Sequence, residues 1–173
     1  MVFNMDSDEF SEQLWNNLMK NIDTTRKGRG YIIDRVIQME ILLNQIISSF
    51  FSDDKEKYKN FNELILNKEF FTLHQKIKIF SELKLHKDKK FDKKFEGLTE
   101  RLFEVNKIRN KVAHLNDNPY NPGFNVKIKD KTKRVQLNDK FLKEFEEFMQ
   151  EIYKSLINIQ VESGLAKNFH KHD

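Results

Sequence analysis

Hydrophobic residues recur every three to four positions along most of this chain, which is the spacing of one face of an α-helix. The pattern predicts helices over 7–20, 31–51, 61–66, 73–85, about 98–114 and 139–160. The segment 31–51 has the broadest apolar face, so we expect it at the centre of the core. That face is formed by Ile32, Ile33, Val36, Ile37, Leu42, Leu43, Ile46, Ile47 and Phe50.

Breaks between the predicted helices follow from glycines, charge runs and capping residues. Gly28 and Gly30 flank Arg29, so we predict a flexible basic loop over 24–30 after the first helix. The charged residues 52–60 predict a second loop, and the lysine-rich stretch 86–94 predicts a loop or a frayed helix. Thr72 and Gln75 have the spacing of a capping box.

A second periodicity precedes the last helix. Phe124, Val126 and Ile128 alternate with polar residues, and the turn-forming residues 130–133 lead to Val135 and Leu137. Alternation with a period of two predicts a small β-hairpin over 124–137. Asn138 or Asp139 is placed to cap the helix that follows, and Gly164 predicts its end before a loose tail over 165–173.

These patterns predict an all-α fold: one up-and-down helical bundle over 1–173, with its core at about 31–160 and a β-hairpin inserted before the last long helix. The chain has only two prolines and five glycines, so few residues oppose long helices. Its hydrophobic content of 38% is too high for a disordered chain. The chain has no cysteine, which excludes disulfides and thiolate metal sites. No stretch has the length of a membrane span and the acidic N-terminus lacks a signal-peptide core, so we expect a cytoplasmic protein.

The segment Arg109–His114 is the strongest chemical signal in the chain. It places a fixed cation, the amide of Asn110 and a titratable imidazole within six residues, near the end of a predicted core helix. Histidine exchanges protons near neutral pH, and a guanidinium matches the oxygens of a phosphate. Because the 2′-hydroxyl of RNA is an internal nucleophile, these groups suffice for cleavage of RNA without a metal.

The helical positions of these residues separate their expected roles. Arg109 lies roughly 40° from the centre of the apolar stripe, so we expect its guanidinium to be partly covered and to have an acidic or backbone partner. Asn110 and His114 are four residues apart on one outward face. A purely structural interpretation stays open, because arginine and histidine near a helix end commonly interact with a carboxylate or with the helix dipole.

Glu40 is an acidic residue on the apolar face of the predicted central helix. Residues 33, 36, 43 and 47 lie within about 60° of it on a helical wheel. A buried carboxylate is costly unless it is paired. Two alternatives follow: Glu40 lies at the edge of the stripe and reaches solvent, or it meets Arg109 or His114.

The formal charge of +4 favours a polyanionic partner without requiring one. The predicted RNA-binding residues are the basic neighbours of the motif and of the hairpin: Lys107, Lys111, Lys127, Lys129, Lys133 and Arg134. Lysines on an edge strand also protect it from aggregation, so a solvated basic face is the alternative. No metal site and no cofactor are predicted: a paired His170 and His172 in the tail is a weak signal, and no phosphate-binding glycine pattern is present.

The chain resembles the HEPN superfamily of helical domains. The signature of that family is an arginine, often followed by a polar residue, with a histidine four to six positions beyond the arginine. Arg109, Asn110 and His114 match it. The helix 31–51 resembles the family's early helix, which often carries an acidic residue near the site, so the resemblance places Glu40 with the catalytic residues. The segments beginning at Lys76 and Lys107 also resemble a mannitol-operon repressor-like branch of the family.

The resemblance implies a metal-independent endoribonuclease, a toxin or phage-defence effector, that acts as a homodimer with two motif copies in one cleft. His114 would activate the 2′-hydroxyl or protonate the leaving oxygen, Arg109 would stabilise the transferring phosphate, and Asn110 would position the hydroxyl. Two alternatives stay open: a non-catalytic nucleic-acid-binding or regulatory module of the repressor-like kind, or a protein-interaction subunit paired with an antitoxin or a neighbouring defence protein.

Overall fold

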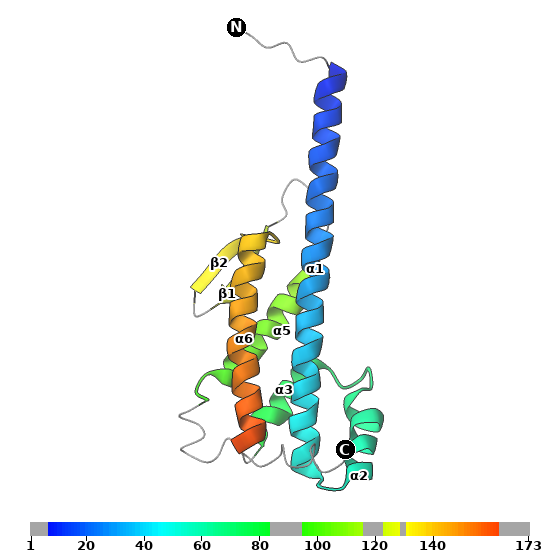
Figure 1. Cartoon of the computed structure of the whole chain (residues 1–173), viewed down its shortest axis with the longest axis vertical. Helices are drawn as coiled ribbons and strands as arrows, with labels where there is room; N and C mark the ends of the chain where they lie inside the picture. Colours follow the sequence, from blue (N-terminus) through cyan, green and yellow to red (C-terminus); the bar gives the residue numbers. More distant parts are fainter. Residues whose placement is uncertain (1–6, 84–94, 116–122, 129–130, 163–173) are drawn as a thin grey trace.

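A single long helix organises the molecule in the computed structural model, which describes residues 7–83, 95–115, 123–128 and 131–162. Helix α1 runs without interruption over Ser7–Phe51, a length of 45 residues. Figure 1 shows the other elements gathered along one part of α1, while its N-terminal part projects beyond them. The predicted loop over 24–30 is therefore wrong, because this segment is helical.

Packing accounts for Gly28 within α1. A Cβ on Gly28 would lie 3.3 Å from the Cβ of Leu137 and 3.7 Å from the methyl groups of Leu142. The absent side chain thus lets α1 approach the start of the last helix closely. The Thr24 hydroxyl donates to the carbonyl of Lys20 at 2.9 Å, which satisfies it within the helix. Tertiary contact here outweighs a helix propensity that is about 1 kcal/mol worse for glycine than for alanine.

The remaining elements follow the predicted order. They are α2 (Lys55–Phe61), the π-helical turn η1 (Asn62–Leu66), α3 (Leu73–Glu82), α5 (Leu98–Ala113), β1 (Gly123–Ile128), β2 (Lys131–Gln136) and α6 (Asp139–Glu162). The fold is all-α with one antiparallel hairpin, as predicted. The charged loop over 52–60 is only partly correct, because Asp54 accepts a hydrogen bond from the Lys57 N–H at 2.9 Å and so caps α2.

Two predicted helix starts are confirmed. Thr72 and Gln75 form the reciprocal bonds of a capping box at the start of α3. The side chain of Asn138 accepts from the Phe141 N–H at 3.0 Å and begins α6. The predictions for 86–94, for the turn residues Lys129 and Asp130, and for the tail 165–173 lie outside the described residues.

One hydrophobic core joins α1, α3, α5, α6 and the inner face of the hairpin. Val36, Leu43 and Ile47 of α1 are buried in it, as are Leu102 of α5 and Phe145 of α6. A polar cluster beside the core ties α1 to α6. The Tyr31 hydroxyl donates to a carboxylate oxygen of Glu146 at 2.5 Å, the Arg35 Nε lies 2.9 Å from the same oxygen, and the Tyr153 hydroxyl donates to the Arg35 carbonyl.

The register of the hairpin decides which of its residues face the core. Val126 pairs with Lys133 and Lys127 pairs with Thr132. Because paired residues of antiparallel strands share a face, Lys133 lies on the inner face with the buried Val126, and Lys127 lies on the outer face. Lys131–Lys133 belong to β2, so the predicted turn over 130–133 extended too far into the strand.

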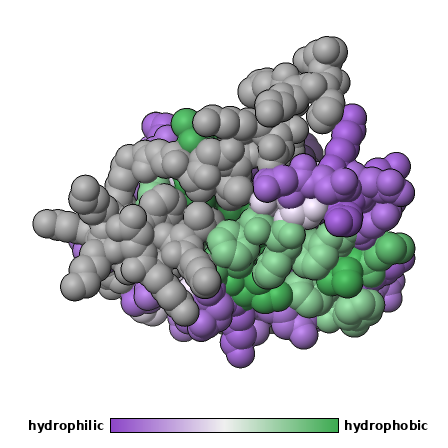
Figure 2. Space-filling view, turned by 90° about the horizontal axis from the view of Figure 1, so that it is seen from below, coloured by the Kyte–Doolittle hydropathy of each residue, from purple (hydrophilic) through white to green (hydrophobic). Residues whose placement is uncertain are grey.

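Exposed hydrophobic side chains gather at both ends of α1. Leu14 and Trp15, on the projecting part, are 54% and 60% exposed. At the other end Phe51, Leu64 and Phe70 are exposed, and the view from below shows hydrophobic residues gathered on this end (Figure 2). In the described part of the chain, no helix combines the length and the apolar character that a membrane span needs.

Candidate functional site

Helix α5 carries the motif on its exposed side. Its buried residues include Leu102, Val105 and Val112, which hold the helix against the core. Arg109 lies outside this face and is exposed, so the prediction of a partly covered guanidinium is wrong. Its Nη1 donates to the Oδ1 of Asn110 at 3.0 Å, so the partner is the neighbouring amide and not a carboxylate or a backbone group.

His114 forms the C-terminal cap of α5. Its backbone N–H donates to the carbonyl of Asn110 at 3.1 Å, and its side chain is exposed, as is that of Asn110. The next residue is anchored to α1, because the Arg29 Nη2 donates to the Leu115 carbonyl at 2.8 Å. This bond fixes the direction in which the chain leaves the motif.

Glu40 reaches solvent in part, as the first alternative had it, but it also has a partner that neither alternative anticipated. It forms an ion pair with Lys76 of α3, and the side chain of Lys76 is 4% exposed while that of Glu40 is 29% exposed. Arg109 and His114 are not its partners. A signal was present in the sequence, because Lys76 falls on the inward face of its helix with Leu73, Ile77 and Phe80.

A cleft of about 630 Å³ brings part of the predicted site together. Glu40, Lys76, Arg109 and Asn110 all line it, whereas His114 does not. Its walls come from α1, α3, α5 and the segment 66–72; the other lining residues are Leu66, Asn67, Lys68, Glu69, Phe71, Thr72, Leu73, His74 and Asn106. The site residues from α1 and α5 therefore share one cavity, but a single copy of the chain does not put the imidazole on it.

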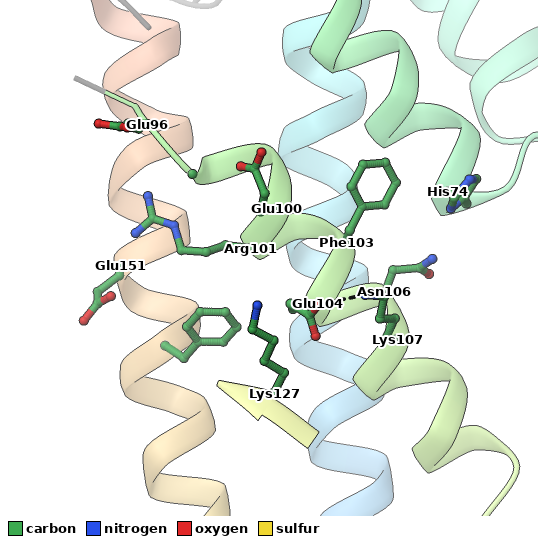
Figure 3. Close-up of a pocket in the computed structure, with 12 residues that line it drawn as sticks. His74, Glu96, Glu100, Arg101, Phe103, Glu104, Asn106, Lys107, Lys127 and Glu151 are labelled. Carbon is green, nitrogen blue, oxygen red and sulfur yellow. Dashed lines mark hydrogen bonds and ion pairs between the residues drawn. The ribbon is translucent and has the colours of Figure 1, made fainter. Parts of the chain in front are cut away.

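A second cleft of about 750 Å³ adjoins the first, and His74 and Asn106 line both (Figure 3). It lies against α5, α6 and β1, and its charges are mixed. Glu96, Glu100, Glu104 and Glu151 line it, as do Arg101, Lys107 and Lys127. The four carboxylates make this cleft a poor path for a phosphate backbone.

The predicted RNA-binding residues differ in their partners. Lys107 pairs with Glu104 at 2.7 Å, and Lys133 pairs with Glu144 of α6. The Lys111 Nζ donates to the Asn125 carbonyl at 2.6 Å, which ties α5 to the hairpin. The outward-facing basic residues of the hairpin are Lys127 and Arg134, both exposed, and Lys129 lies outside the described residues.

Sequence reasoning missed two residues of the first cleft, Lys76 and Asn106. Asn106 is 8% exposed and lies on the buried side of α5 among apolar residues. A polar residue within an apolar stripe was the available signal.

In the ranges that the structure describes, no three His, Cys, Asp or Glu side chains converge in a way that could hold a metal ion. Comparison of the chain with known protein families, with curated proteins and with solved structures found no match.

Proposed function

We propose that this protein is a metal-independent endoribonuclease of the HEPN type that acts as a homodimer, with a role as a toxin or phage-defence effector. The observation that carries the proposal is the exposed Arg109 guanidinium, held by the amide of Asn110 at the edge of a cleft. One of its five N–H groups is used in that bond, and the guanidinium makes no other hydrogen bond to the described residues, which leaves donors for phosphate oxygens. His114 follows one helical turn later.

The proposed reaction is an internal transfer of the phosphate. The 2′-hydroxyl of RNA loses its proton and its oxygen attacks the adjacent phosphorus, while the bond to the 5′-oxygen breaks and that oxygen takes up a proton. The products are a 2′,3′-cyclic phosphate and a 5′-hydroxyl. His114 serves one of the two proton transfers, since imidazole both accepts and donates protons near neutral pH.

Arg109 and Asn110 act on the phosphate. The guanidinium faces the charge that builds on the phosphate oxygens, where a preorganised cation lowers the barrier. Asn110 is a positioning residue, because its carbonyl oxygen holds the guanidinium in place. The homodimer is part of the proposal because His114 does not line the cleft that Arg109 and Asn110 line. A second copy would bring its own histidine to that cleft.

Expression of matched variants tests the proposal. Wild type should arrest growth and fragment cellular RNA. His114→Ala and Arg109→Ala should each lose at least about a hundredfold in cleavage rate, as is typical for loss of a proton-transfer group or of a preorganised charge. Lys154→Ala, which removes an exposed cation of α6 outside both clefts, should behave as wild type. Salt-sensitive RNA binding that survives His114→Ala without any cleavage would favour the non-catalytic binding module instead.

A further inference from the structure

The proposed cleavage chemistry leaves one polar group of the cleft unused. Asn106 is 92% buried and lines the cavity that Arg109 and Asn110 share. Within the described residues its amide has no hydrogen-bond partner, and its oxygen and nitrogen are not fully enclosed by the protein, so they are open to the cleft. Figure 3 shows the amide end pointing away from the axis of α5, towards the side on which His74 lies. An amide that is open to the cleft and has no partner among the described residues is available to a bound ligand with a matching edge.

The rest of the cleft suits a flat ring. Leu66 and Leu73 are buried apolar residues of its lining, and Phe71 contributes a half-buried aromatic ring. A volume of about 630 Å³ falls within the range of small-ligand sites, which combine apolar walls with few polar groups. Asn106 supplies one such group, and the partly exposed carboxylate of Glu40 supplies another.

The charges of the cleft separate an inner region from a rim. Inside, the positive charge of Lys76 is neutralised by Glu40. At the rim, the side chains of Arg109, Lys68 and Glu69 are exposed, so two cations and one carboxylate leave a net positive charge there. A phosphate is therefore favoured at the rim and an uncharged group inside, which is the arrangement of a nucleotide with its base in the cleft.

We infer that the cleft holds an adenine base of the RNA next to the phosphate bound by Arg109, and that Asn106 reads its edge. The inference rests on the proposed function. An asparagine amide offers one donor and one acceptor in a plane, which match the N7 acceptor and the N6 amino group of adenine. Glu40 accepts the second amino hydrogen, which selects a base with an amino group over uracil.

Binding of RNA that cannot be cleaved tests this inference separately from catalysis. Short 2′-O-methyl oligomers of A, C and U lack the nucleophile, so their affinities do not depend on cleavage. Wild type should bind the A oligomer about tenfold tighter than the U oligomer, the effect of one bidentate base contact. His114→Ala should keep this preference.

Asn106→Asp keeps the shape of the side chain and removes the donor to N7, so the preference for the A oligomer over the U oligomer should fall. Asn158→Asp, on the exposed side of α6, should bind as wild type does. Displacement of the A oligomer from wild type by AMP and by UMP compares the two bases without any variant. Equal affinity of wild type for all three oligomers, tighter binding of C than of A, or an unchanged preference in Asn106→Asp would overturn the inference while leaving the proposed cleavage intact.

Discussion

The ion pair between Glu40 and Lys76 joins two residues in unequal surroundings. Lys76 is almost fully buried, whereas nearly a third of the Glu40 side chain reaches solvent. Removal of one partner from a buried ion pair costs about 3–5 kcal/mol when the other charge stays buried. The two halves of this pair should therefore differ in what their loss costs.

We expect Glu40→Leu to lower the free energy of unfolding by more than Lys76→Met does. Glu40→Leu leaves an unpaired ammonium in the core, while Lys76→Met leaves a carboxylate that water still hydrates. Urea unfolding of both variants and of the double variant measures the difference. A larger loss for Lys76→Met would contradict the observed burial.

Glu146 gives the α1–α6 contact a pH dependence. Burial acts to raise the pKa of this carboxyl, but hydrogen bonds from Tyr31 and Gln150 and the charge of Arg35 outweigh it, so the pKa is lowered from its ordinary value of 4.5. A carboxyl whose pKa is lower in the folded state stabilises the fold above its unfolded pKa. That stabilisation is lost as the pH falls below 4.5 and through the folded pKa.

Glu146→Gln should therefore flatten the fall in stability below pH 4.5, and the exposed neighbour Glu147→Gln should not. Thermal melts of both variants between neutral and acidic pH measure this. An equally steep acid limb in Glu146→Gln would show that other carboxyl groups dominate.

At the scale of elements, the sequence predicted most helices and the hairpin correctly because their apolar positions repeat with a clear period. It failed at 24–30, where two glycines suggested a loop. The missing information was tertiary: Gly28 packs against Leu137 and Leu142, residues more than one hundred positions away. The helix propensity of a short segment does not depend on contacts with residues so far away in the sequence.

Alanine at the two glycines tests the continuity of α1. Gly30 has open space around its Cβ position, so Gly30→Ala should raise the free energy of unfolding by up to about 1 kcal/mol through helix propensity. Gly28→Ala should gain less or lose stability, because its Cβ crowds Leu137 at 3.3 Å. Denaturant unfolding of both variants gives the comparison. Destabilisation by Gly30→Ala would indicate a loop in place of the helix.

For the whole molecule, the sequence predicted the all-α fold, but it predicted only part of the arrangement of the site residues. Arg109, Asn110 and Glu40 line the same cleft, but the ion-pair partner of Glu40 is Lys76, which the sequence did not predict. The basic residues of the hairpin have different surroundings, since Lys133 pairs with Glu144 of α6 and Lys127 lines the second cleft. Strand register, which periodicity alone does not give, decides this difference.

A composite site in a homodimer makes a specific prediction for mixed variants. Suppose that Arg109 of one copy works with His114 of the other. A dimer of one Arg109→Ala copy and one His114→Ala copy then has one complete site, because the second copy supplies the arginine and the first supplies the histidine. Random exchange of equal amounts then returns about a quarter of the wild-type cleavage rate, because half of the dimers are mixed and each has one of two sites. No recovery after subunit exchange would show that the two residues act within one copy or that no dimer forms.

The most direct test of the central claim is the chemistry of the RNA ends. Purified wild type and His114→Ala are incubated with a labelled RNA and a chelator, and the fragments are analysed by mass. We expect wild type to yield fragments with 2′,3′-cyclic phosphate and 5′-hydroxyl ends and His114→Ala to yield none. Intact RNA with wild type, or equal cleavage by the variant, would contradict the central claim.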